Sequence, residues 1–165
     1  MSEKLPELIV YPPISVAMAT CNGEKYLEEQ LDSILSQTLK PVEIVVCDDK
    51  STDRTVEILE RYSRLGLIRY CENEHRLGFI ANFKKAVSLC SSGNYIALSD
   101  QDDVWHPGKL ELSAKYLQKI DDTKLPVMVY SDLILVDQHK NIINRSFRDE
   151  LGQGGYHYCL ETLFF

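Results

Sequence analysis

Short apolar runs alternate with longer amphipathic segments along residues 14–120, and this alternation limits the fold more than any other feature of the chain. The apolar runs begin at Ile14, Val42, Leu67 and Tyr95. Apolar side chains recur at three- and four-residue spacing, which is typical of helices with one buried face, in residues 24–37, 52–62, 77–89 and 106–120. Strands that alternate with helices predict an α/β fold with a mostly parallel sheet covered on both faces.

Length and composition restrict the class of protein. The 165 residues, 44% hydrophobic and 26% charged, suffice for one globular domain with a real core. A net charge of -7 and the lack of a basic stripe argue against nucleic acid as a partner. No apolar run approaches the roughly 18 residues that a membrane span needs.

The cysteines and the N-terminus predict a cytoplasmic protein. The five cysteines are odd in number and show no CxxC pair, which favours buried free thiols in a reducing compartment; they are Cys21, Cys47, Cys71, Cys90 and Cys159. Residues 1–13 are charged, contain proline and lack the apolar core of a signal peptide. Peripheral association with the inner face of a membrane stays open.

The alternation of strand-like and helical segments ends after Pro126. Residues 127–130 and 133–136 are strand-like, and residues 137–141 predict a hairpin turn before Ile142 and Ile143. The sequence then becomes polar and rich in glycine before ending on Leu163-Phe164-Phe165. An apolar end of this kind is unusual for a complete domain and indicates a truncation.

Polar side chains follow three of the expected strands at the point where each strand ends. They are Thr20 to Glu24 after the first strand, Asp48-Asp49 after the second and Asp100-Gln101-Asp102-Asp103 after the fourth. In an open parallel sheet, ligands bind beyond the carboxyl ends of the strands. The chain contains neither GxGxxG nor GxxxxGK[ST], which argues against a dinucleotide-binding or P-loop enzyme.

The segment that ends in Asp100, Asp102 and Asp103 predicts a metal site. Three carboxylates within four residues repel one another, and a divalent cation is their usual compensation; Mg²⁺ is often held by one or two carboxylates plus substrate phosphates. The alternative is a solvated acidic turn in which Asp103 caps the following helix.

Several blocks of the sequence resemble the family-2 glycosyltransferases in order and spacing over roughly residues 14–120. The resemblance rests on Ile14 to Gly23 with Tyr26-Leu27, Ser33 to Thr38, Val45 to Asp53, Asn73 to Gly78 with Asn82, and Tyr95 to Trp105. The last block is similar to the DxD region of that family. The Ser99-Asp100-Gln101-Asp102-Asp103 form, followed by Tyr130-Ser131-Asp132, is similar to the rhamnosyltransferase-like branch that builds O-antigen and capsule polysaccharides.

The resemblance implies a GT-A fold, a Rossmann-like three-layer sandwich truncated at the C-terminus, with a nucleotide-diphosphate-sugar donor and Mn²⁺ or Mg²⁺. It implies a domain plan of an N-terminal extension (1–13), a nucleotide-sugar-binding domain (14–125) and the start of an acceptor-side subdomain (126–165). The acceptor would be a saccharide or a lipid-linked molecule.

The same resemblance assigns roles to single residues. Thr20 and Glu24, with Asn22 in the same loop, would lie against the nucleoside, and Asp49 would accept a hydrogen bond from the pyrimidine N3. Asp100 and Gln101 would lie at the ribose and sugar side, and Arg76 could pair with a phosphate. The metal that bridges the two donor phosphates would be bound by Asp102.

The catalytic residue of an inverting transferase is missing from this sequence. Inverting members of the family use a carboxylate as general base, in an ED-type motif downstream of the hairpin region. Neither Glu150 nor Glu161 has a matching context. We therefore expect the base to lie beyond Phe165.

Ordinary structural roles are expected for the other polar or aromatic residues. Asp48 is expected to bond to nearby backbone amides, Ser51 or Thr52 to cap the second helix, and Trp105 to pack in the core. His106 is expected at a helix start, and Lys84 and Lys85 on the solvated face of an amphipathic helix.

Two rival functions remain at this point. The chain could be a nucleotide-sugar-binding module without catalytic activity of its own. A phosphate-receiving signalling domain would also carry aspartates at strand ends, but it would place the acidic pair after the first strand and a lone aspartate after the third. The sequence makes no prediction of the donor sugar, the base, the linkage or the oligomeric state.

Overall fold

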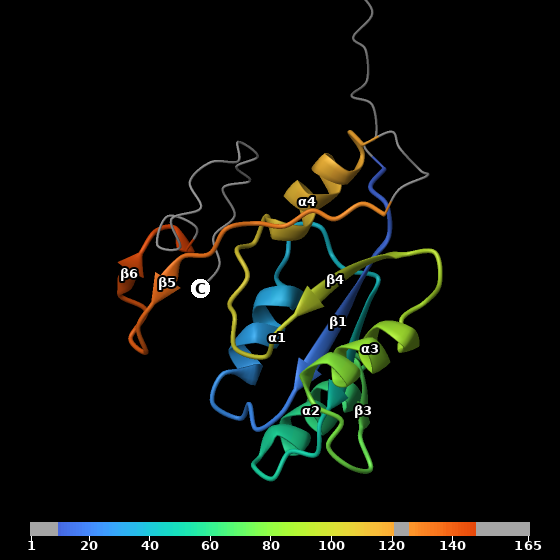
Figure 1. Ribbon diagram of the computed structural model, residues 1–165, viewed down its shortest axis with the longest axis vertical. Coiled ribbons are helices and arrows are strands. Elements are labelled where there is room, and N and C mark those ends of the chain that lie inside the picture. Colours follow the sequence, from blue (N-terminus) through green and yellow to red (C-terminus); the bar gives the residue numbers. More distant parts are fainter. Residues whose placement is uncertain (1–9, 121–125, 148–165) are drawn as a thin grey trace, which may run out of the picture.

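The computed structural model describes residues 10–120 and 126–147, and its centre is a parallel sheet of four strands. The strands are β1 (Ile14–Thr20), β2 (Glu43–Asp48), β3 (Arg69–Glu72) and β4 (Tyr95–Ser99), in the order β3-β2-β1-β4. β1 pairs with β2 on one side and with β4 on the other, so the two strands with acidic ends flank the first strand (Figure 1). The predicted parallel sheet is therefore confirmed.

Four helices connect and follow these strands. They are α1 (Leu27–Leu35), α2 (Thr55–Arg64), α3 (Phe79–Leu89) and α4 (Lys109–Leu117). β1 sends alternate side chains to opposite faces of the sheet. Val16 and Met18 lie in the large core with residues of α1, α2 and α4, whereas Ala17 packs with Cys47 of β2 and Ala86 of α3 on the other face.

The predicted cap of the second helix is wrong, and so is the alternative role of Asp103 as a cap of the fourth. The first residue of α2 is Thr55, and Asp53 rather than Ser51 or Thr52 accepts the Thr55 backbone N–H, at 3.0 Å. α4 begins at Lys109 after Gly108, too far along the chain for Asp103 to cap it. The side chain of His106 accepts the Gly108 N–H at 3.3 Å, as expected of a residue at a helix start.

The C-terminal part of the described chain contains a short hairpin of β5 (Leu135–Val136) and β6 (Ile142–Asn144). The predicted turn at 137–141 is confirmed, because Asp137 accepts the backbone N–H groups of His139 and Asn141. The predicted strand at 127–130 is wrong. Those residues pair with no described strand, although valine and tyrosine, which they contain, are common in strands.

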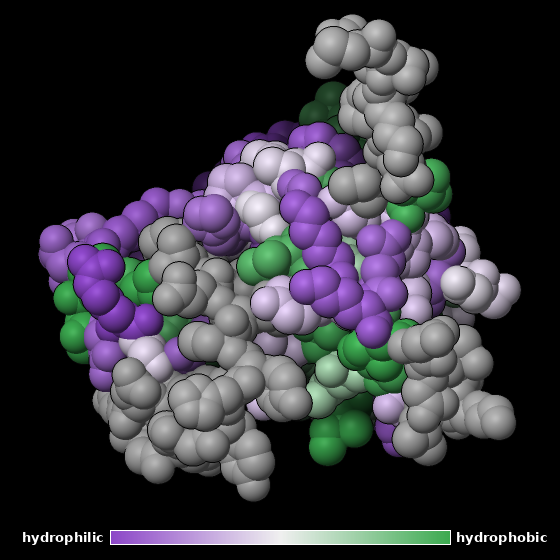
Figure 2. Space-filling view, turned by 90° about the horizontal axis from the view of Figure 1, so that it is seen from above, coloured by the Kyte–Doolittle hydropathy of each residue, from purple (hydrophilic) through white to green (hydrophobic). Residues whose placement is uncertain are grey.

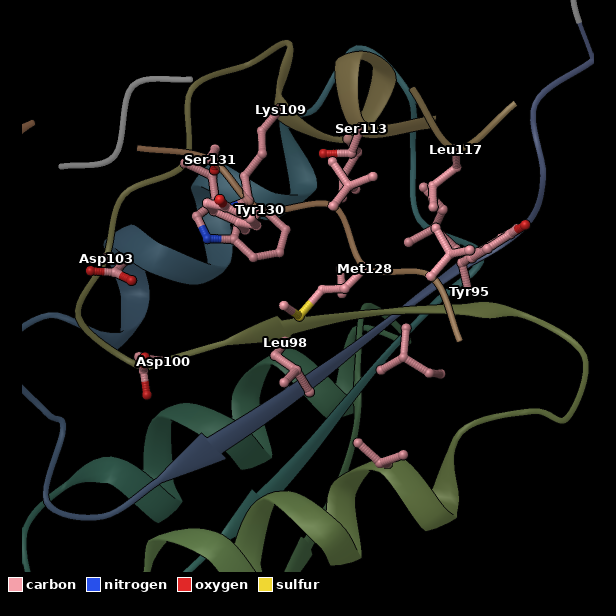
Figure 3. A pocket seen from close by; sticks show the side chains of 18 residues that line it. Tyr95, Leu98, Asp100, Asp103, Lys109, Ser113, Leu117, Met128, Tyr130 and Ser131 are labelled. Carbon is pink, nitrogen blue, oxygen red and sulfur yellow. The ribbon is translucent and has the colours of Figure 1, made fainter. Parts of the chain in front are cut away.

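Residues 127–131 form one wall of a groove beside β4. The groove has a volume of about 580 Å³, and α4 and Trp105 form its other side. Figure 3 shows Leu98 and Met128 facing each other across it, with Asp100 and Asp103 at one end and Leu117 at the other. Because β4 is the last described strand on its side of the sheet, Leu98 keeps 59% of its surface exposed.

The outer surface mixes polar and apolar residues. Figure 2 shows hydrophilic side chains over much of the upper face, with apolar side chains beside them on the β5–β6 hairpin at the left. Ile143 of this hairpin is 68% exposed. None of the helices in the described part of the chain is long and apolar enough to cross a membrane.

Candidate donor site at the carboxyl edge of the sheet

The three loops that follow β1, β2 and β4 meet at one edge of the sheet, because these strands are neighbours and parallel. The backbone N–H of Asp49 donates to the carbonyl of Thr20 at 2.8 Å and joins the ends of β1 and β2. The residues predicted to bind the donor lie in these loops or in the 73–78 loop after β3, except Thr20, which is the last residue of β1. Their side chains do not all face solvent, and the contacts of each define what it can do.

Asp48 has the structural role expected of it. Its carboxylate is fully buried and accepts the Thr20 hydroxyl at 2.9 Å and the Ser51 backbone N–H at 2.8 Å. Thr20 is itself 2% exposed, so its hydroxyl is committed to Asp48. Any contact of Thr20 with a nucleoside would therefore use other atoms of this residue.

Asp49 is 95% buried, yet its surroundings stabilise the ionised form of its carboxylate. Its Oδ1 atom accepts from Asn73 Nδ2 at 2.9 Å and from the Leu77 N–H at 2.7 Å, and its Oδ2 atom accepts from the Gly78 N–H at 2.8 Å. Burial alone would raise the pKa of Asp49, but these three donors and the charge of Arg76 lower it below the usual value. Each carboxylate oxygen accepts two hydrogen bonds, so Oδ2 keeps capacity for one more donor.

Asn73 and Lys85 were missed by the sequence reasoning, and both support Asp49. Asn73 Nδ2 also donates to Asn82 Oδ1 at 2.9 Å, and Asn82 Nδ2 donates to the carbonyl of Cys47 at 2.8 Å. Lys85 Nζ donates to Asn73 Oδ1 at 2.7 Å, so the prediction that Lys85 lies only on a solvated face is wrong. The sole signal for this network in the sequence was the family resemblance around Asn73 and Asn82.

Asn22 and Glu24 join the loop after β1 to the loop after β2. Asn22 adopts a positive φ of 54°, and its Oδ1 atom accepts the Thr52 N–H at 2.8 Å. Glu24 Oε2 accepts the Arg54 N–H at 2.9 Å, while the Glu24 N–H donates to Asp53 at 3.0 Å. These polar groups therefore fix the relative position of two loops as well as lining the edge.

Gln101 holds the acidic loop against the loop after β1. The Cys21 N–H donates to Gln101 Oε1 at 2.8 Å, and Gln101 Nε2 donates back to the Cys21 carbonyl at 3.2 Å. A Cβ atom on Gly23 would overlap the Gln101 amide, so only glycine permits this close approach. The sequence placed Gln101 at the donor; in the structure its amide group faces protein backbone.

The carboxylates of residues 100–103 concentrate negative charge at the end of the groove. Burial and then the charge of Asp102 raise the pKa of Asp100, and burial with the charges of Asp100 and Asp102 raises the pKa of Asp103 to about 6. Lys109 opposes this charge from the start of α4. Its ammonium lies 4.5 Å from the centre of the Trp105 ring, and burial lowers its pKa to about 7.

The carboxylate loop fits a cation only together with phosphates. Asp100 and Asp102 are exposed, whereas Asp103 is half-buried. Within residues 10–120 and 126–147, no three His, Cys, Asp or Glu side chains lie as a set that could hold a metal ion by themselves. One or two carboxylates plus substrate phosphates are the usual ligand set of Mg²⁺, which matches what this loop offers.

A buried polar cluster on α1 and just after its end positions the acidic loop from behind. Gln30 Nε2 donates to the Ser99 hydroxyl at 2.6 Å, and the Trp105 N–H donates to the Ser33 hydroxyl at 3.0 Å. Gln37 accepts the Leu110 N–H at 3.0 Å. Trp105 is 2% exposed, which confirms its predicted place in the core.

The remaining predicted residues differ in how far the structure describes them. Arg76 is exposed, and its positive charge acts on Asp49. The cysteines Cys21, Cys47, Cys71 and Cys90 are free, and Cys47 is buried. Cys159, Glu150 and Glu161 lie outside the described residues.

Comparison with known sequences identifies the family. The sequence profile described as "Glycosyl transferase family 2" matches residues 15–162. An uncharacterized glycosyltransferase of Methanocaldococcus jannaschii is 37% identical over 142 residues, which cover 84% of this chain and 47% of that protein. The chain spans less than half of the length of the curated relatives it matches.

Solved structures share the fold. TarS of S. aureus in complex with UDP-GlcNAc superposes with a TM-score of 0.59 and 25% identity, over 70% of this chain and 37% of that one. The mannosyltransferase PcManGT of Pyrobaculum calidifontis, solved with GDP-Man and Mn²⁺, gives a TM-score of 0.58 at 23% identity, over 82% and 40% of the two chains. These neighbours are GT-A glycosyltransferases, which confirms the expected fold class. The chain belongs to glycosyl transferase family 2.

Proposed function

We propose that the carboxyl edge of this sheet binds the nucleoside diphosphate of a sugar donor, and that the protein is an inverting glycosyltransferase. The observation that carries the proposal is the convergence of Asp49 and the carboxylates of 100–103 at one edge. The Gln101–Cys21 hydrogen bonds join the acidic loop to the loop after β1, and the bond from the Asp49 N–H to the Thr20 carbonyl joins the end of β1 to Asp49.

In this proposal Asp49 recognises the base. Its Oδ2 atom already accepts one backbone N–H and has capacity for a second donor, which the N3–H of uracil or thymine would supply. The nucleoside would lie beside the end of β1 and the loop after it, at Thr20, Asn22 and Glu24. Arg76 would offer its guanidinium to a phosphate. UDP and dTDP are the nucleotides that suit this arrangement.

Asp102, exposed at the tip of the acidic loop, would be the protein ligand of Mn²⁺ or Mg²⁺, with Asp100 beside it at the ribose and sugar side. A bound cation stabilises the charge that develops on the leaving nucleoside diphosphate. Gln101 keeps this loop in register with the nucleoside loop through its bonds to Cys21. Its role at the donor is therefore positional.

The acceptor site and the general base are not among the residues assigned to the donor site. The described residues contain the proposed donor half of a site, and in this proposal the general base lies outside them. A saccharide or lipid-linked acceptor in cell-surface polysaccharide synthesis is the expected substrate, by resemblance to the rhamnosyltransferase-like branch. The alternative is a donor-binding module without activity of its own, and transfer assays with an acceptor panel on the 165-residue chain separate the two.

The experiment that tests the donor site is calorimetric titration of UDP and dTDP with and without Mn²⁺. We expect binding that requires the metal, and we expect Asp102→Ala to abolish that requirement together with most of the affinity. Asp137→Ala, in the distant hairpin turn, is the matched control and should bind like the wild type. Unchanged Mn²⁺-dependent affinity in Asp102→Ala would contradict the assignment.

A further inference from the structure

The first turn of α3 carries an exposed aromatic ring beside the buried Asp49 carboxylate. Phe79 is 68% exposed, although burying a phenyl ring in a core stabilises a fold by about 1.5–3 kcal/mol. It directly follows Gly78, whose N–H donates to Asp49 Oδ2. An exposed ring at this position calls for an explanation.

The exposure of Phe79 arises from where the sheet ends. Asn82 and Ala86 of α3 are buried against the sheet, and Phe79 precedes Asn82 by three residues, so it lies on the same side of the helix. Asn82 already bonds to the carbonyl of Cys47, near the end of β2. Helical side chains lean toward the N-terminus, so the ring of Phe79 extends past the ends of the strands. Figure 1 shows the start of α3 near the arrowhead of β1.

The ring is held by a neighbour. Phe83, one turn along the helix and half-buried, contacts Phe79 with ring centroids 5.0 Å apart and an angle of 72° between the planes. This edge-to-face contact is a favourable arrangement of two aromatic rings. It orients Phe79 and still leaves most of the ring surface open.

Three groups that can each contact a ligand in a different way therefore lie near the start of α3. Asp49 offers a hydrogen-bond acceptor on Oδ2, Arg76 offers a positive charge, and Phe79 offers an aromatic surface. A flat heteroaromatic ring with an imino N–H, linked to a phosphate, matches all three. Uracil and thymine have that N–H at N3, whereas cytosine has an unprotonated N3.

We propose that Phe79 is the stacking surface for the nucleobase of the donor, so that base selection is shared between Phe79 and Asp49. This inference rests on the proposed donor site and deepens it. It assigns a residue that contributes through the face of the base, independent of the metal at the phosphates. Loss of one base–aromatic stack weakens binding by about 5- to 150-fold.

The chain contains a matched control for this claim. Ile80 is 69% exposed, as exposed as Phe79, but it is one residue further along the helix and so points about 100° away around the axis. Removing either side chain deletes an exposed apolar group, and only Phe79 lies on the side of α3 that faces the sheet edge.

The test is titration of UDP and CDP, in the presence of Mn²⁺, into wild type, Phe79→Ala, Phe79→Leu, Phe79→Trp and Ile80→Ala. We expect Phe79→Ala and Phe79→Leu to weaken UDP binding at least fivefold, Phe79→Trp to retain it, and Ile80→Ala to stay within twofold of wild type. CDP should bind more weakly than UDP to the wild type. Far-UV circular dichroism of each variant checks that the fold is retained.

The outcomes distinguish a failure of the Phe79 role from a failure of the donor site. If the wild type binds UDP and Phe79→Ala binds it as tightly as Ile80→Ala, the role of Phe79 is overturned and the donor site stands. If Phe79→Leu binds like wild type while Phe79→Ala does not, apolar bulk rather than stacking is responsible, and the proposal is wrong. If the wild type binds no nucleotide with or without Mn²⁺, both the donor site and this inference fail.

Discussion

The Gln101 amide lies in the space that a Cβ atom on Gly23 would occupy, and both of its polar atoms bond to the backbone of Cys21. This contact ties the acidic loop after β4 to the nucleoside loop after β1. It spans 80 residues of sequence, and it makes one unit of the two halves of the proposed site.

Replacing Gly23 by alanine should break this contact. The added methyl group would displace the Gln101 amide and cost its two hydrogen bonds, and we expect the free energy of unfolding to fall by about 1–2 kcal/mol. Urea unfolding measures the change. In a Gln101→Ala background the same Gly23→Ala change should cost much less, and an equal cost in both backgrounds would contradict the coupling. Gly108→Ala, where the nearest atom lies 3.7 Å from the new Cβ, is the control.

Replacing Asp49 by asparagine should destabilise the loop after β3. The amide nitrogen of asparagine would oppose one of the three donors that the carboxylate accepts, from Asn73, Leu77 and Gly78. A buried donor without a partner costs about 1–3 kcal/mol, and thermal or urea unfolding measures the loss. Glu74→Gln, an exposed change in the same loop, should stay within about 0.5 kcal/mol of wild type. A matching small effect at both positions would mean that Asp49 is not the centre of this loop.

Protonation of Glu43 should lower the free energy of unfolding in acid. Burial would raise its pKa, but the Ser15 hydroxyl, the Ser91 N–H and Arg69 lower it to about 2. Because the folded-state pKa lies below the unfolded value of about 4.5, this stabilisation is complete above pH 4.5 and is lost as the pH falls toward 2.

The comparison of wild type with Glu43→Gln tests this pH dependence. At pH 7 the variant should be less stable by about 1–3 kcal/mol, and the difference should shrink through the window from pH 4.5 to 2. A difference that does not change with pH would show that the carboxylate charge has no part in the effect.

The thiol of Cys47 should resist alkylation in the native protein. Burial raises its pKa to about 12, and its sulfur contacts that of Cys71 on the neighbouring strand at 2.9 Å. At pH 8 such a thiol is almost entirely protonated, and the thiolate is the reactive form. Mass-spectrometric mapping after iodoacetamide treatment should show Cys47 labelled at least about tenfold more slowly than the half-exposed Cys21. In 6 M guanidinium the two should react alike, and equal rates in the folded state would contradict the burial of Cys47.

The sequence was sufficient for the parts of the fold that depend on local pattern. Apolar runs and helical spacing locate all four strands of the parallel sheet and the four helices around them. Because the carboxyl ends of parallel strands share one edge, the pattern also predicts that Asp49 and Asp102 belong to the same side of the molecule.

The parts that could not be predicted depend on contacts between residues distant in sequence. Gln101 turns toward Cys21, and Lys85 reaches Asn73, for reasons that no local pattern encodes. The expected strand at 127–130 has apolar composition but no ladder partner among the described strands, and ladder partners are a tertiary property. Asp53, and not Ser51 or Thr52, accepts the first backbone N–H of α2, because the exact start of a helix depends on the conformation of the preceding loop.

Hydrogen–deuterium exchange of the 165-residue protein, with and without UDP and Mn²⁺, tests the central claim most directly. We predict that the two ligands together slow exchange in residues 20–24, 49–54, 73–79 and 100–105, and leave the β5–β6 hairpin unchanged. Protection confined to the groove beside β4, or to the hairpin, would place the ligand elsewhere and contradict the donor site at the carboxyl edge of the sheet.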